Sequence, residues 1–225
     1  MRAHFTRDLE HLNDEILILG NMVVGATLQA IDALIQRRAD LGEEVLKGDD
    51  EIDMKELDVE EQCLKVLALY QPVAGDLRYI VSILKVNNDL ERIGDLAGHI
   101  AGRAVYLAEN PPISLPARFN EMVELVRTMV QQSLESLVRQ DAKLALEVVL
   151  ADDTVDEIHW ESYRELLGRM RSEIDIIDRA FHTISAVRHL ERIADYATNI
   201  AEDVYFMVEG EIIRHRLETG HREDN

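Results

Sequence analysis

Apolar residues recur at spacings of three and four along almost the whole of this 225-residue chain. Such spacing places the apolar side chains on one face of an α-helix. The clearest stripe consists of Ile80, Ile83, Leu84, Leu90, Ile93, Ala97, Ile100 and Ala104. A second stripe consists of Phe181, Ile184, Val187, Leu190, Ile193, Ala197, Ile200 and Val204. No stretch shows the alternation typical of a β-strand, and only 4 Pro and 11 Gly interrupt the pattern, so an all-α fold is expected.

A few breaks divide the chain into long helices. Pro72 and Gly75 frame a turn, three prolines lie within residues 111–116, and residues 171–175 form a polar stretch. These breaks and the periodicity predict helices at residues 5–38, 41–70, 74–109, 117–140, 142–171 and 174–210. A helix of about 30 residues is about 45 Å long at ~1.5 Å per residue, which suits an antiparallel bundle.

The chain also carries one pattern twice. The segments "NNDLERIGDLAGHI" (87–100) and "VRHLERIADYATNI" (187–200) match at an offset of 100 residues. The segments "GDDEID" (48–53) and "ADDTVD" (151–156) match at an offset of 103. Duplication of a three-helix unit explains both matches.

This duplication predicts two tandem three-helix bundles of long antiparallel helices. The first bundle is expected at residues 1–110 and the second at 117–212. A linker at 111–116 joins them, and residues 213–225, which lose the apolar spacing, are expected to form a flexible tail.

Four pairs of carboxylates stand four residues apart, and therefore on one face of a helix. They are Asp49/Asp53, Glu91/Asp95, Asp152/Asp156 and Glu191/Asp195. Like charges at this spacing destabilise an isolated helix by a few tenths of a kcal/mol, which is a reason to expect a cation nearby.

The hairpin turns bring these pairs to a common height. In the first half Asp49 and Asp95 are equally far from Pro72 along the chain, and so are Asp53 and Glu91. In the second half the turn lies between residues 173 and 174. Asp152 and Asp195 are equally far from it along the chain, and so are Asp156 and Glu191. Each half therefore is expected to set four carboxylates side by side on two antiparallel helices.

Two facing pairs supply four to eight oxygen ligands, enough for one hard cation or a small cluster. Iron, manganese, magnesium and zinc all fit such a donor set. His99, one turn beyond Asp95, adds a candidate nitrogen ligand, and Asn199 stands at the equivalent turn of the second repeat. The alternative is that Arg92 and Arg192 form surface ion pairs with these carboxylates, which then bind nothing specific.

Charge limits the partners of the chain. With 44 acidic and 24 basic residues the formal net charge is −20, which repels nucleic acid and anionic lipid and attracts cations and basic protein surfaces. The most apolar stretch, residues 16–33, is interrupted by polar side chains, so neither export nor direct membrane insertion is expected. The single cysteine, Cys63, allows no intramolecular disulfide and is expected to be a buried small hydrophobe.

Two long segments resemble the signatures of a known family. "PVAGDLRYIVSILKVNNDLERIGDLAGHIA" (72–101) and "HLERIADYATNIAEDVYFMVEGEIIRH" (189–215) are similar to those of PhoU, a regulator associated with bacterial phosphate transport. The resemblance implies metal-binding E/D-x-x-x-D motifs, in some members holding multinuclear iron clusters, so iron is the favoured metal. The motif maps onto Asp49, Asp53, Glu91, Asp95, Asp152, Asp156, Glu191 and Asp195. His99 departs from it, because an Asn is expected there.

The resemblance also implies a biological role. It indicates a cytoplasmic, often homodimeric adaptor between the phosphate-transport ABC ATPase and a sensor histidine kinase. Such an adaptor represses the phosphate-starvation response when phosphate is plentiful.

Two other readings remain open at this point. No nucleotide loop or catalytic Ser/His/Asp or Cys/His arrangement is found, so no enzymatic activity is expected. A carboxylate-bridged iron protein of the ferritin-like type needs Glu-x-x-His pairs, whereas the chain offers Glu218/His221 in the tail and one Asp version, Asp156/His159. A metal-free helical scaffold that docks basic surfaces is the third possibility.

Overall fold

The computed structural model describes residues 2–213, and within this range the chain is almost entirely helical. The long helices are α1 (Arg2–Gln36), α2 (Ala39–Tyr70), α3 (Ala74–Glu109), α4 (Phe119–Arg139), α5 (Ala142–Ser172) and α6 (Ile177–Glu209). None of residues 2–213 forms a β-strand, which confirms the all-α prediction. The expected tail lies, from residue 214 on, outside the described residues.

The ends of the helices lie within three residues of the predicted ones. The largest difference in the second half is at residues 174–176, which form a short 3₁₀ helix, η1 (Ile174–Ile176), before α6 begins. The backbone N–H of Ile176 donates to the carbonyl of Glu173 at 3.3 Å, the tighter bonding pattern of a 3₁₀ turn.

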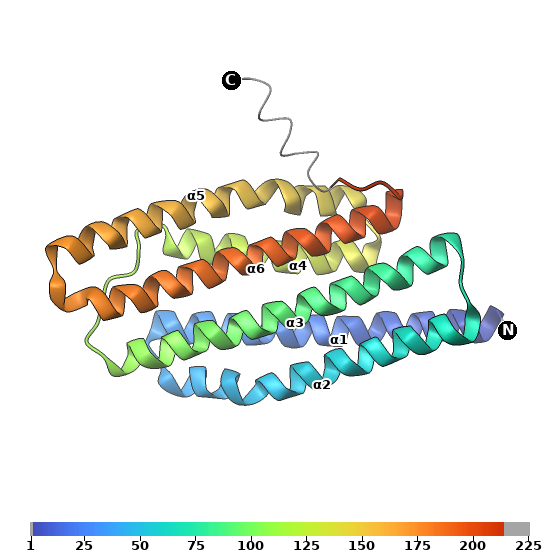
Figure 1. The fold of residues 1–225 in the computed structure, drawn as a ribbon, viewed down its shortest axis with the longest axis horizontal. Helices are drawn as coiled ribbons and strands as arrows, with labels where there is room; N and C mark the ends of the chain where they lie inside the picture. Colours follow the sequence, from blue (N-terminus) through green and yellow to red (C-terminus); the bar gives the residue numbers. More distant parts are fainter. Residues whose placement is uncertain (1, 214–225) are drawn as a thin grey trace, which may run out of the picture.

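The two bundles lie side by side (Figure 1). Helices α1, α2 and α3 contact one another, as do α4, α5 and α6, and the bundles meet through α3 against α6 and α1 against α4. The α2/α3 turn is at the right of Figure 1 and the α5/α6 turn at the left, so the equivalent hairpins point in opposite directions.

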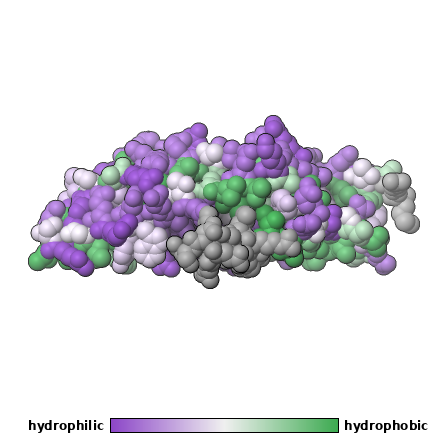
Figure 2. Space-filling view, turned by 90° about the horizontal axis from the view of Figure 1, so that it is seen from above, coloured by the Kyte–Doolittle hydropathy of each residue, from purple (hydrophilic) through white to green (hydrophobic). Residues whose placement is uncertain are grey.

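One hydrophobic core runs through all six helices. Most residues of both predicted stripes are buried in it, each such Ile or Leu contributing about 1.5 to 3 kcal/mol. Leu84 and Ile184 are half-buried, and Phe181, close to the α5/α6 turn, is exposed. Cys63 is buried and unpaired, as expected. Hydrophilic residues cover most of one long face of the molecule, with small hydrophobic patches between them (Figure 2).

Helix α1 is the one helix in the described part that is long and apolar enough to cross a membrane by length and composition. In the fold, its apolar side chains face the other helices: Leu12, Ile16, Leu19 and Val23 are completely buried in the core. A core helix of a soluble bundle has this same character.

Polar contacts join α3 to α6 near the end of the molecule where α6 terminates. Arg78 Nε donates to the carbonyl of Met207 at 3.0 Å, and Lys85 Nζ donates to Asp203 Oδ1 at 2.8 Å. Helix α6 ends at Glu209 and is followed by Gly210, which has a φ of 77° and where a Cβ would lie 2.6 Å from Arg78 Nη1. Glycine is favoured there by the left-handed backbone, and it leaves room for the guanidinium that packs on it.

Candidate metal centres

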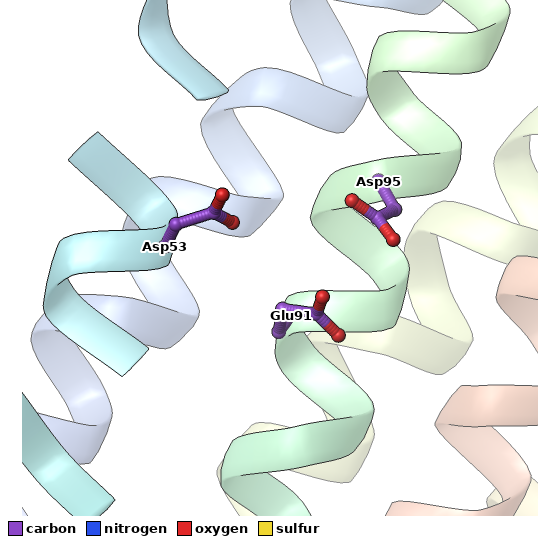
Figure 3. A group of neighbouring side chains, drawn as sticks. All are labelled: Asp53, Glu91 and Asp95. Atoms are coloured by element: carbon purple, nitrogen blue, oxygen red, sulfur yellow. The ribbon is translucent and has the colours of Figure 1, made fainter. Parts of the chain in front are cut away.

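The first cluster of carboxylates lies between α2 and α3. Asp53 of α2 and Glu91 and Asp95 of α3 each offer one oxygen, and these three atoms all lie within 4.8 Å of one another. Figure 3 shows Asp53 reaching from α2 toward the two carboxylates on α3. We call this group the first centre.

Small residues on α3 allow α2 to approach closely at this height. A Cβ at Gly94 would lie 3.1 Å from Ile52 Cγ2, and one at Gly98 would lie 3.9 Å from both carboxylate oxygens of Asp49. The close crossing therefore lies at the level of the first centre. Gly102, one turn further, has open space instead.

Asp49 lies outside the tight group of three but close to it electrostatically. Partial burial, followed by the charges of Asp53 and Asp95, raises the pKa of Asp49. Burial and the charge of Asp95 likewise raise the pKa of Glu91. The first centre is therefore a region of negative potential that disfavours the ionised forms of Glu91 and of the neighbouring Asp49.

Arg92 partly offsets this repulsion. Its Nε lies 3.3 Å from Glu91 Oε2 and its Nη1 lies 3.6 Å from Asp95 Oδ2. This is the surface ion pairing that the sequence offered as the alternative to a metal. The pairs are half-exposed, and such pairs are worth ~0 to 1 kcal/mol.

The second cluster repeats the first between α5 and α6. Asp156 of α5 and Glu191 and Asp195 of α6 each place one oxygen within 4.8 Å of the others. We call this group the second centre. Here the arginine behaves differently: Arg192 Nη2 lies 3.3 Å from the hydroxyl of Tyr196, and its guanidinium carbon is 5.9 Å from the centre of that ring.

Repulsion is stronger at the second centre. Burial, together with the charges of Asp195 and Asp156, raises the pKa of Asp152 to about 7. Burial and the charges of the same two aspartates raise the pKa of Glu191 to about 7. In addition, Asp152 Oδ1 is buried and has no hydrogen-bond partner within residues 2–213. A cation here would relieve the repulsion and satisfy an oxygen that nothing else in this part of the chain binds.

His159 also faces the second centre. Its Nδ1 lies 3.6 Å from Glu191 Oε1, and burial lowers the pKa of the imidazole in spite of the nearby Asp156. Sequence reasoning noted His159 only as half of a ferritin-like pair. Its position three residues after Asp156, on the same helical face, is the signal that could have placed it at the centre.

In each half three carboxylates converge rather than the expected four, because Asp49 and Asp152 lie outside the tight groups. His99 and Asn199 do not join these groups either. The ring of His99 packs at 5.2 Å from that of His189 on α6, and Asn199 lines a hollow with Lys85 and Asp203. The reason is helical drift: each step of four residues turns about 40° around the axis. Two steps from Glu91 to His99 therefore rotate the side chain from the α2 side toward α6.

The donor sets fit a cation of the kind expected. Three carboxylates within 4.8 Å are ligands that hard divalent and trivalent ions prefer, and the second centre adds an imidazole nitrogen nearby. Within the described residues, no other group of three or more Asp, Glu, His or Cys side chains is placed this closely.

Comparison with known proteins agrees with this duplicated architecture. The model of a family described as "PhoU domain" matches residues 16–104 and 119–204, and each match contains one of the two centres. The chain belongs to the PhoU family.

Relatives from several bacteria support the assignment. A protein of Aquifex aeolicus named "Phosphate-specific transport system accessory protein PhoU homolog" is 44% identical over 210 residues, covering 93% of this chain and 95% of the relative. One of the same name from Pseudomonas aeruginosa is 40% identical over 214 residues, covering 94% of this chain and 88% of the relative. These names describe accessory proteins rather than enzymes.

Solved PhoU structures share the fold. The crystal structure of PhoU from Pseudomonas aeruginosa matches with a TM-score of 0.90 and 39% identity, covering 92% of this chain and all (100%) of that one. The phosphate transport system regulatory protein PhoU from Streptococcus pneumoniae matches with a TM-score of 0.86 and 28% identity, covering 92% and 98%. The all-α fold of repeated bundles is thus a property of the PhoU family.

Proposed function

We propose that this PhoU-family protein is an accessory regulator of phosphate uptake that holds divalent or trivalent cations at its two centres. The observation that carries the proposal is the repeated geometry: in each half, three carboxylates from two helices converge within 4.8 Å. The relatives named as accessory proteins of phosphate-specific transport supply the biological setting. Iron is the preferred ion, with zinc, manganese or magnesium as alternatives, and each centre can hold more than one.

The chain's own residues define what each centre does. A cation held by Asp53 of α2 and by Glu91 and Asp95 of α3 would link these two helices, and one held by the equivalent residues would link α5 to α6. A bound cation supplies Lewis-acidic positive charge on a protein whose net charge is −20. Its occupancy therefore changes both the cohesion of each hairpin and the local sign of the surface potential.

We further propose that the protein works in the cytoplasm, as a homodimer, between the phosphate-transport ABC ATPase and a sensor histidine kinase. In this role it represses the phosphate-starvation response when phosphate is plentiful. The acidic surface favours partners with basic faces, because opposite potentials accelerate and orient association. Nucleic acid is repelled by the same charge.

A metal-free scaffold is the competing function, and one observation favours it. Arg92 already bridges two carboxylates of the first centre, which reduces the need for a cation there. In that case the acidic faces dock basic partner surfaces directly.

Equilibrium dialysis followed by metal analysis separates the two functions. We expect wild-type protein to retain metal and the Glu91→Ala, Asp95→Ala variant to lose about half of it, because one of two similar centres is removed. The matched control is Glu10→Ala, Asp14→Ala, which removes two carboxylates at the same spacing on α1 that belong to neither centre. Equal metal retention by wild type and the first variant would support the scaffold.

Partner binding provides the second arm of the experiment. Metal-loaded and chelator-treated protein are each tested for binding to the purified transport ATPase and to the kinase's cytoplasmic part. The regulator hypothesis predicts tighter binding of at least one partner by the loaded form. Identical binding by both forms and by the Glu91→Ala, Asp95→Ala variant would contradict it.

A further inference from the structure

The two centres differ in one chemical respect that the duplication makes visible. At the offset of 103 that aligns "GDDEID" with "ADDTVD", the residue equivalent to His159 is Glu56. The second centre therefore has an imidazole at the position where the first centre has a carboxylate.

The imidazole of His159 is placed as a donor to the second centre. Its side chain is 15% exposed, and its Nδ1 lies 3.6 Å from Glu191 Oε1. That nitrogen is buried and has no hydrogen-bond partner among the residues that the structure describes. A buried ring nitrogen normally has a partner, so one that faces a carboxylate group without bonding to it suits a shared cation.

Glu56 has a different environment in the first half. Asn87 Nδ2 donates to Glu56 Oε1 at 2.8 Å and to the carbonyl of Glu56 at 3.0 Å. The carboxylate is thus held by an amide, and whatever it contributes to the first centre is oxygen. His99 is exposed, its ring packs on that of His189, and it is not among the three side chains that converge within 4.8 Å, although its charge acts on the neighbouring Asp49.

We propose that His159 is a nitrogen ligand of the second centre, so that the two centres select different cations. This inference rests on the proposed cation binding. With three carboxylates and an imidazole, the second centre favours a borderline transition-metal ion such as Zn²⁺, Fe²⁺ or Co²⁺. With oxygen donors alone and Arg92 competing, the first centre shows less preference for such ions over Mn²⁺ or Mg²⁺.

Single-centre proteins test this selection. Glu91→Ala, Asp95→Ala leaves only the second centre, and Glu191→Ala, Asp195→Ala leaves only the first. Affinities for Zn²⁺ and Mn²⁺ are measured on each by competition with a metal-binding dye. The ratio of Zn²⁺ to Mn²⁺ affinity is expected to be at least about tenfold larger for the second centre, because imidazole binds Zn²⁺ better than it binds Mn²⁺.

His159→Gln in the second-centre protein is the decisive variant. It keeps a polar side chain of similar reach but removes the imidazole, so the ratio is expected to fall about tenfold. His99→Gln in the same background is the matched control and should leave the ratio unchanged. The chain's single tryptophan, Trp160, lies next to the second centre with its ring 5.6 Å from that of His159, so quenching by Mn²⁺ reports occupancy there.

Pulsed electron paramagnetic resonance adds a readout that does not depend on measured affinities. With one equivalent of Cu²⁺, imidazole coordination gives a characteristic modulation from the remote ring nitrogen. The second-centre protein should show this modulation, and His159→Gln should remove it.

The outcomes separate this inference from the proposed function. Failure of the second-centre protein to bind Zn²⁺ and Mn²⁺ would overturn cation binding and this inference together. Metal binding with no imidazole signal, or with a Zn²⁺ to Mn²⁺ ratio unaffected by His159→Gln, would overturn the role of His159 and leave cation binding intact.

Discussion

The two centres share a backbone arrangement and differ in their immediate neighbours. At the first, Arg92 bridges Glu91 and Asp95, and burial and the charge of Asp95 raise the pKa of Glu91. At the second, no arginine bridges the equivalent pair within the described residues, and the pKa values of Asp152 and Glu191 are raised to about 7. Duplication has thus kept the position of the carboxylates, while single substitutions around them set the charge.

One such substitution explains why Arg92 and Arg192 have different partners. Tyr196 stands four residues after Arg192 and attracts its guanidinium through the ring face and the hydroxyl. The equivalent residue after Arg92 is Leu96, which is buried and offers neither. Arg92 therefore forms ion pairs with the carboxylates. Arg192 forms none within the described residues, although its charge still acts to lower the pKa of Glu191 and Asp195.

The largest predicted effect is the increase in the free energy of unfolding when cations bind to the two centres. A cation that binds only the folded state at about a hundred times its Kd stabilises the protein by about 2.7 kcal/mol for each occupied centre. Wild-type protein should gain from both centres, and each single-centre variant from one. Thermal unfolding with and without Mn²⁺, reversed by chelator, measures the gain. An equal gain in wild type and in a variant lacking both centres would show that the ion acts elsewhere.

A smaller effect is expected of pH on the folding stability of the metal-free protein. Because burial and like charges raise the pKa of Asp152 above its ordinary value of 3.8 to about 7, the folded state keeps a proton there that the unfolded chain releases. This contribution is fully present below about pH 4 and is lost as pH rises toward 7.

Histidines such as His159, whose pKa is lowered by burial, change the stability of the wild type with pH in the opposite direction. The test therefore compares wild type with Asp152→Asn, since the histidines contribute equally to both proteins. Each pKa unit corresponds to about 1.4 kcal/mol, and screening at this partly exposed site reduces the total. The variant should therefore gain about 1 to 2 kcal/mol relative to wild type between about pH 4 and pH 7. Urea unfolding across this range measures the difference, and a constant difference would contradict the assigned burial and repulsion.

The smallest effect is expected from Tyr196→Leu, which gives the second centre the neighbour found in the first. Released from the tyrosine, Arg192 should pair with Glu191 and Asp195 and compete with a cation. An exposed pair of this kind is worth ~0 to 1 kcal/mol, so cation affinity at the second centre should fall by up to about fivefold. Quenching of Trp160 fluorescence in the Glu91→Ala, Asp95→Ala background measures this affinity. Tighter cation binding by the Tyr196→Leu variant would be inconsistent with the role given to Tyr196.

The sequence predicted the features that depend on distance along a helix. Apolar periodicity and the breaks at Pro72 and residues 111–116 located the helices, and counting from the turns placed Asp53 level with Glu91. Both centres follow from this one-dimensional information, because antiparallel helices with equal rise keep their register.

Features that depend on rotation or on the other bundle could not be predicted in this way. His99 and Asn199 were expected at the centres, but drift around α3 and α6 turns them toward the interface between the bundles. Arg78 donates a hydrogen bond to the carbonyl of Met207, which lies 129 residues further along the chain. The choice of Arg192 between a carboxylate and a tyrosine depends on side-chain conformation, which spacing alone does not determine.

The most direct test of two cation centres is anomalous diffraction from crystals of the protein soaked in Mn²⁺. The geometry predicts one strong group of anomalous peaks beside Asp53, Glu91 and Asp95, and another beside Asp156, Glu191 and Asp195. Peaks confined to other acidic surfaces, with both groups of carboxylates empty at saturating Mn²⁺, would contradict the account.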